Sequence, residues 1–190
     1  LIYSVTFSAA ELNSLDAPTS GLITGASVTG ITSSTAAAAT TALSSAGISV
    51  TNPTVAISDV TISAAELNTL DALTSGVVTG ASVTGITSST VAAVTTLLVT
   101  NTATTVLTNP TVTLSDTGSA AAVDAIIDKT SGIVTGTVTA DTAANLAAAI
   151  THGSATDALT LTVSAGVVDI SKMTALNADT SVDVGATAAT

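Results

Sequence analysis

The sequence predicts a repeat protein, an α/β or β-solenoid of about seven coils that each hold one short strand and one short helix. Three observations support this fold: an internal repeat of about 55 residues, a shorter period of about 24 residues within it, and helix-start signals set among Val/Thr-rich segments. A single unit cannot bury its own apolar face, so such units are stable only when they stack. The alternative fold is an antiparallel β-sandwich in which the Ala-rich stretches are loops.

The repeat is clear in two segments. "VTFSAAELNSLDAPTSGLITGASVTGITSST", from Val5, matches "VTISAAELNTLDALTSGVVTGASVTGITSST", from Val60, at a constant offset. A third copy, "GSAAAVDAIIDKTSGIVTG", and a fainter fourth, "ISKMTALNADTS", follow. Within a repeat, Leu67 matches Val91, which predicts coils that alternate between about 24 and 31 residues. We expect one solenoid array over 1–190, with repeats at about 1–55, 56–111, 112–167 and a partial 168–190.

Local signals place the helices and strands. Ser63 and Glu66 form a capping box, in which Ser63 is the N-cap and Glu66 the third helical residue. Leu67 and Leu70 follow on one helix face. Asp141 is expected to cap the helix in "DTAANLAAAI". Val/Thr-rich runs with period-two alternation, such as "NPTVTLSD" and "ALTLTV", predict strands.

Apolar residues at matching places in successive coils are expected to form the core. At about 4.8 Å per coil, seven stacked strands would give a rod segment on the order of 30–35 Å long. The expected core residues are Leu12/Leu15, Ala37 to Ala39, Leu67/Leu70, Val91/Val94, Val123/Ile126, Leu146/Ile150 and Met173/Leu176.

The composition excludes several classes of function. There are two basic and thirteen acidic residues, for a net charge of −11, so Lys129 and Lys172 cannot form a nucleic-acid or anionic-lipid surface. No stretch approaches about 18 uninterrupted apolar residues, so we expect no transmembrane helix. The chain has no Cys and is rich in Thr, Ser, Ala and Gly, which favours an exported bacterial protein. It does not begin with Met and has no signal-peptide pattern, which predicts an internal or processed segment.

The sequence offers no constellation for catalysis or tight metal binding. His152 is the only imidazole, so neither a zinc site nor a Ser-His-Asp triad can be assembled, and we expect an exposed loop residue. "GASVTG" lacks the lysine and spacing of a phosphate loop. We therefore expect no enzyme and no catalytic, cofactor-binding or metal-binding residues.

Two groups of polar residues recur at similar places in successive copies. The aspartates are expected to be solvated turn or helix-end residues: Asp16, Asp71, Asp128 and Asp179. The second group is expected to make turn or surface hydrogen bonds: Asn13, Asn68, Asp124 and Asn177. Copies two coils apart would lie about 10 Å from each other, which is too far for one calcium ion to bridge. Weak calcium binding through backbone carbonyls and water stays open.

With its motif "SAAELNTLDALTSG", the sequence resembles the long tandem arrays in giant repetitive cell-surface proteins of cyanobacteria and other aquatic bacteria, described as S-layer-like or adhesin-like. This resemblance implies an extracellular structural or adhesive role without an assigned active site. We expect an extracellular segment or subunit of a filament, sheath or surface layer. Its partner would be another copy, joined head to tail, and cell-surface polysaccharide is a second candidate partner. The alternative is a stalk, spacer or binding module of a large bacterial adhesin.

The only aromatic residues, Tyr3 and Phe7, stand in "LIYSVTF" at one end of the chain. Phe7 matches Ile62 of the next repeat, so it either fills an ordinary core position or covers the end of the array. In the second case this strand would connect one copy of the chain to the next.

Overall fold

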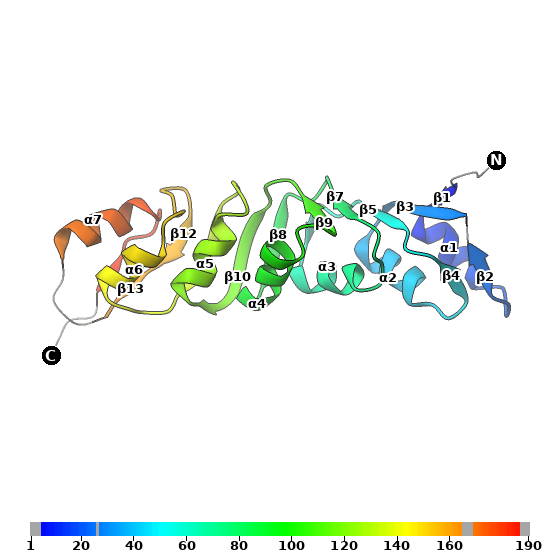
Figure 1. The fold of residues 1–190 in the computed structure, drawn as a ribbon, viewed down its shortest axis with the longest axis horizontal. Helices are drawn as coiled ribbons and strands as arrows, with labels where there is room; N and C mark the ends of the chain where they lie inside the picture. The colour runs from blue at the N-terminus through cyan, green and yellow to red at the C-terminus, as the bar shows by residue number, and fades with distance from the viewer. Residues whose placement is uncertain (1–4, 26, 165–168, 187–190) are drawn as a thin grey trace. The chain divides into compact units, whose positions relative to one another are not determined.

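The computed structural model describes residues 5–25, 27–164 and 169–186. The chain divides into two compact units, which we describe separately. The first unit extends to Thr84 and includes Thr100–Thr108, and the second contains Gly85–Val99 and the chain from Asn109 onward. Both are mixed α/β, with short helices beside parallel strands (Figure 1).

The first unit is built on one parallel sheet, with a smaller strand pair beside it. The sheet has the order β1-β3-β5-β7-β9, and the pair is β2-β4. In the sheet, Val55 pairs with Val78, and Val78 pairs with Thr105. The strands of this unit are β1 (Val5–Phe7), β2 (Ile23–Gly25), β3 (Val28–Ser34), β4 (Ile48–Val50), β5 (Thr54–Ile57), β6 (Thr61–Ile62), β7 (Val78–Gly80) and β9 (Thr105–Leu107).

Three helices complete the first unit: α1 (Ala9–Asp16), α2 (Ala36–Ser44) and α3 (Ala64–Asp71). The capping box predicted at Ser63 is confirmed, because its hydroxyl accepts from the Glu66 amide at 3.2 Å and the Glu66 carboxylate accepts from the Ser63 amide at 3.1 Å. The Ser63 hydroxyl and amide lower the pKa of Glu66. Ser8 and Glu11 form the same box at the start of α1.

The second unit repeats the same pattern. Its parallel sheet contains β12-β11-β10-β8 in that order, and β13 pairs with β14. The strands are β8 (Gly85–Ser89), β10 (Thr111–Gly118), β11 (Val134–Val138), β12 (Ala158–Thr160), β13 (Thr162–Val163) and β14 (Gly185–Ala186). The helices are α4 (Val91–Val94), followed by the π-helical η1 (Thr95–Thr100), α5 (Ala120–Ile127), α6 (Ala143–Ala149) and α7 (Ile170–Ala178).

The pairing of the strands excludes the alternative fold, the antiparallel sandwich. Every pairing that joins described strands within a unit is parallel, which is incompatible with the antiparallel sandwich. The predicted alternation of shorter and longer coils is wrong, because α1, α2 and α3 begin at nearly equal intervals, at Ala9, Ala36 and Ala64. The two halves of a repeat have to be aligned on the N-caps of their helices. Ser63 then corresponds to Thr90, so the counterpart of each core residue lies three positions later than the sequence alignment predicts.

Most of the predicted core residues are buried. Leu67, Leu70, Val94, Val123 and Ile126 are fully enclosed, and Leu12, Ala39, Val91, Leu146, Ile150 and Leu176 are also buried. The prediction that Leu15 belongs to the core is wrong, because this residue is 49% exposed. Ala37 is exposed as well, because α2 buries the i, i+3, i+6 positions Ala36, Ala39 and Ala42 instead. Met173 is only half-buried, on a helix whose one fully buried side chain is Leu176.

The aromatic end of the chain is described in part. Phe7 is half-buried in β1 and pairs with Ile31 of β3, as an ordinary strand residue would. Tyr3 lies outside the described residues.

One predicted helix cap is displaced by a residue. Thr142, not Asp141, is the N-cap of α6, and its hydroxyl accepts from the Asn145 amide at 3.2 Å. The Asp141 carboxylate instead accepts from the Thr142 amide and the Asn145 side chain, at 2.7 and 2.9 Å. These two bonds, of which that from Asn145 is the stronger influence, lower the pKa of Asp141.

Candidate functional site

The most specific repeated feature is a junction that we call the clasp. It joins an Asn-Pro dipeptide at the entry of a strand to the Thr-Ser-Gly loop that follows the next helix. In the first unit, the Thr74 hydroxyl donates to the Pro53 carbonyl at 2.7 Å and accepts from the Gly76 amide at 2.9 Å. The Ser75 amide points at the Asn52 side-chain oxygen, 3.4 Å away. The buried Thr74 side chain therefore links two segments that lie 21 residues apart.

The second unit contains the same clasp. The Thr130 hydroxyl donates to the Pro110 carbonyl at 2.6 Å and accepts from the Gly132 amide at 3.0 Å. A variant follows at Thr180, whose hydroxyl bonds to the carbonyls of Asp157 and Leu159 at 3.2 and 2.9 Å. All three threonines are buried, with 4–8% of each residue exposed.

Each residue of the clasp has a physical reason. Asn52 and Asn109 have φ values of 47° and 46°, a left-handed conformation that asparagine tolerates better than most residues. The proline that follows fixes φ at the strand entry without needing an amide donor. Glycine completes the loop because a Cβ at Gly76 would lie 2.6 Å from the carbonyl carbon of Pro53, and the same distance separates Gly132 from Pro110.

The recurring aspartates connect the end of a helix to a later loop. Asp16 accepts from the Ser45 hydroxyl at 2.7 Å. Asp71 accepts from Asn101, Thr104 and Thr105 at 3.0, 3.1 and 3.1 Å. Asp16 and Asp71 are the last residues of α1 and α3, as the prediction of helix-end residues has it, but both are half-buried and not fully solvated.

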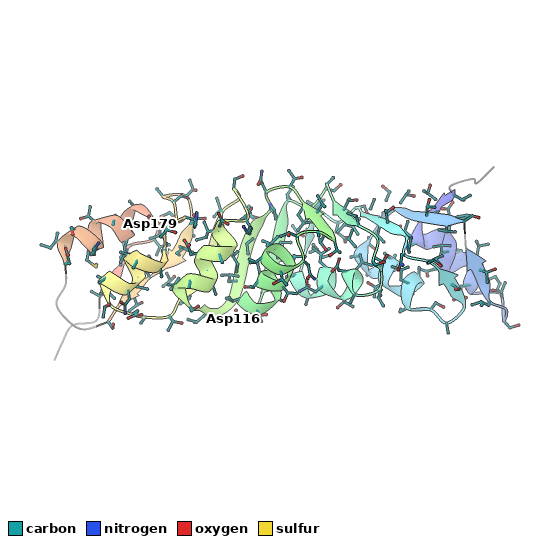
Figure 2. All side chains as sticks on the ribbon, viewed as in Figure 1. Asp116 and Asp179 are labelled. Carbon is teal, nitrogen blue, oxygen red and sulfur yellow. The ribbon has the colours of Figure 1, made fainter. Side chains whose placement is uncertain are left out.

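The other predicted polar residues divide between contacts and solvent. The Asn13 side chain donates to the Ala38 carbonyl at 3.2 Å, in the predicted role of a local hydrogen-bond residue. Asn68 is half-buried and Asn177 is exposed. Asp179, labelled in Figure 2, is half-buried at the end of α7. Burial and the nearby Asp124 carboxylate raise the pKa of Asp179.

Sequence reasoning missed a second use of aspartate, at the starts of helices. Asp59 accepts from the Ala36 amide in the first turn of α2 at 2.7 Å. Asp116, labelled in Figure 2, accepts from the Val91 amide at the start of α4, also at 2.7 Å. A carboxylate there satisfies a free amide and complements the helix dipole. The recurrence of "SD" after "NPTVAI" and "NPTVTL" was the available signal.

His152 lies in a small ionic cluster. Its Nδ1 is 2.9 Å from Asp124, and its Nε2 is 3.4 Å from Asp128, which also bonds to Lys129 at 2.6 Å. The prediction of a merely exposed loop residue is therefore incomplete, although half of the imidazole side chain is exposed. The hydrogen bond to Asp124 raises the pKa of His152. Burial opposes the ionisation of Asp124, but bonds from His152 and Thr151 outweigh it and lower the pKa.

This cluster does not have the geometry of a catalytic triad. Nδ1 of His152 is shared by Asp124 and the Thr151 hydroxyl, and Nε2 faces the carboxylate of Asp128. The nitrogen that would take a proton from a nucleophile therefore points at another acid. Within the described part of the chain, no group of three or more His, Cys, Asp or Glu side chains could hold a metal ion.

Comparisons with models of known protein families, with curated proteins and with solved structures find no match to this chain. In residues 5–25, 27–164 and 169–186, no helix has the length and apolar character needed to cross a membrane.

Proposed function

We propose that this chain is an extracellular structural protein, a solenoid segment or subunit of a filament, sheath or surface layer that assembles head to tail. The observation that carries the proposal is the clasp, which occurs twice, with a variant at Thr180, and joins a strand entry to the loop of a later turn of the chain. Carboxylates that could otherwise perform chemistry also bond to distant segments of the chain. Asp59, Asp71 and Asp116 all bond to groups at least 23 residues away.

Stacking of parallel strands within each unit supports the solenoid architecture. Each unit places strands that are consecutive turns of the chain beside one another, so each turn contacts mainly its neighbours. The structural role also fits the resemblance to S-layer-like and adhesin-like surface proteins of aquatic bacteria.

Exposed apolar surfaces support self-association. In the first unit, Phe7, Ala10 and Leu15, together with Glu11 and Ser14, line a hollow of about 460 Å³ on α1. In the second unit, Ile170 and Met173 line one of about 340 Å³ on α7, and Ile170 is 79% exposed. Two different surfaces that bury each other form a heterologous contact, which builds an open filament when the rotation does not close.

A row of exposed threonine hydroxyls supports the polysaccharide as a second partner. Thr113 pairs with Thr135, and Thr117 pairs with Thr137, across β10 and β11. Thr160 continues the second row on β12. All five threonines are exposed, and their hydroxyls can donate to and accept from sugar hydroxyls.

Electron microscopy of the purified chain tests the proposal. We expect fibres whose axial repeat corresponds to a whole number of coils. Leu15→Asp should prevent their growth, because it places a charge in an apolar contact, while Thr41→Asp on the exposed face of α2 should not. Single thin rods that stay monomeric would refute the filament and favour the alternative, a stalk, spacer or binding module of a large adhesin.

A further inference from the structure

The third repeat, in the second unit, departs from the second repeat at one place. In the first unit, the carboxylate of Asp71 at the end of α3 accepts hydrogen bonds from side chains of the loop at 101–105. Its counterpart at the end of α5, counted back from the clasp threonine, is the apolar Ile127. The loop that follows is also longer, because residues 150–157 lie between α6 and β12, whereas 101–104 lie between η1 and β9. Both differences occur beside the same pocket.

This pocket, of about 260 Å³, lies between the end of α5, the clasp loop and the loop before β12. Its volume is that of about nine water molecules in the liquid, which is room for one sugar ring. Of the residues that line it, Ser131 and Thr156 are exposed, and half of the His152 side chain is exposed. Ile127 and Asp157 also line the pocket and are buried. The pocket therefore combines hydroxyl and imidazole groups that solvent reaches with an apolar wall.

The loop before β12 is held by segments that precede and follow it in the chain. Asp124 of α5 accepts from the Thr151 and His152 amides at 2.7 and 2.8 Å. After α7, the Ser181 hydroxyl donates to the Asp157 carbonyl at 2.9 Å. The walls of the pocket are thus in place without a ligand, so binding does not have to order this loop.

The lining of the pocket suits a ligand with several hydroxyl groups. The hydroxyls of Ser131 and Thr156 can each donate and accept, which matches the hydroxyls of a sugar. Ile127 offers an apolar surface to the C–H groups of a sugar ring. A few polar groups beside an apolar wall are the usual composition of a small-molecule site.

The charges around the pocket disfavour an anionic ligand. Asp157 is part of the wall, and Asp124 and Asp128 lie 2.9 and 3.4 Å from the ring nitrogens of His152. Lys129 already bonds to Asp128 at 2.6 Å. A ligand that carries a carboxylate or phosphate would therefore meet an excess of negative charge, whereas a neutral sugar would not.

We propose that this pocket binds one neutral sugar residue of a polysaccharide. The clasp loop and the loop before β12 lead directly into β11 and β12, whose exposed Thr135, Thr137 and Thr160 would contact further residues of the same glycan. The inference rests on the proposed function, because it gives a site to the polysaccharide partner named there.

The direct test is an NMR titration of the isotope-labelled chain with glucose, galactose and mannose, with glucuronic acid as the anionic comparison. At least one neutral sugar should shift the amide signals of Ser131, His152 and Thr156 saturably, in the millimolar range, and glucuronic acid should bind about tenfold more weakly. Ser131→Ala and Thr156→Val should each weaken binding about five- to tenfold by removing one hydrogen bond.

Ser75→Ala is the matched control, because Ser75 is the counterpart of Ser131 in the clasp loop of the first unit. It should leave binding unchanged. Ser131 and Thr156 are exposed, so circular dichroism melts of their variants should match the wild type. Absence of saturable shifts with all three neutral sugars, or equal binding by the wild type and both pocket variants, would overturn the site.

Affinity electrophoresis through a gel that contains galactomannan separates the pocket from the proposed function. Retardation that Ser131→Ala and Thr156→Val reduce, and Ser75→Ala does not, would support the pocket even in a chain that never forms fibres. Retardation that both pocket variants leave unchanged would keep the polysaccharide as a partner and overturn the pocket as its site.

Discussion

Replacing Gly76 by alanine should destabilise the chain by about 2 kcal/mol. The added methyl carbon would lie 2.6 Å from the Pro53 carbonyl carbon and 2.8 Å from the Asn52 carbonyl oxygen. Both neighbours are backbone atoms, so the strand entry itself has to move. Such overpacking costs about 1–3 kcal/mol, and loss of the Thr74 hydrogen bond about 1 kcal/mol more. The restricted unfolded chain returns about 0.4–1 kcal/mol.

The chain contains its own control in Gly21→Ala. The same substitution in the matching loop of another repeat meets open space, so it should be neutral or should stabilise by up to about 1 kcal/mol. Gly132→Ala should repeat the cost of Gly76→Ala in the second unit, because its methyl group would meet Pro110 at the same distance.

Urea unfolding followed by circular dichroism measures the difference in the free energy of unfolding between the two variants. In a thermal melt, a loss of about 2 kcal/mol corresponds to a melting temperature lower by about 4–8 °C in a chain of this size. If Gly76→Ala and Gly21→Ala melt together, the glycine does not serve close approach in the clasp, and the reasoning fails.

Other perturbations address the core and the ionisable groups. Changing Leu67 and Leu70 to aspartate should cost at least about 3 kcal/mol, and an unchanged circular dichroism melt would contradict their burial. The pKa of His152 is raised above 6.5, so the contribution of protonated His152 to the stability of the folded chain is complete below about pH 6.5 and is lost as the pH rises through the raised pKa. His152→Ala should flatten this pH dependence of the free energy of unfolding in urea. Since burial raises the pKa of Asp179, Asp179→Asn should raise the melting temperature at pH 7 but not below about pH 3, and a stabilisation independent of pH would refute this. Titration calorimetry should detect no sub-micromolar calcium binding, because the described residues contain no cluster of three ligands, and a tight isotherm would overturn that.

Local chemistry could be predicted from the sequence, whereas contacts between distant segments could not. The capping box at Ser63 and Glu66 and the buried Leu67 and Leu70 depend on spacings of three or four residues, which the sequence displays directly. The prediction that Leu15 is buried is wrong although "SAAELNSLD" almost repeats "SAAELNTLD". Burial depends on what packs against a helix and not on the sequence of the helix itself.

The candidate site shows the same limit more sharply. "TNPTV" and "TSG" are both visible as repeated words, but nothing in either word says that Thr74 bonds to Pro53. The same is true of Asp71 with Asn101 and of Asp124 with His152, partners that lie far apart in the chain. A contact of that kind requires the stacking to be known first.

The use of the acidic residues explains how a chain with so few cations can hold these contacts. Thirteen carboxylates face two lysines, so ordinary ion pairs can satisfy few of them. Asp59 and Asp116 bond to helix-start amides instead, and Asp157 accepts from the Val134 amide while 3% exposed. Charge-assisted bonds to backbone amides are short and directional. Each of these three bonds requires a neighbouring turn of the chain, so these carboxylates stabilise stacked turns.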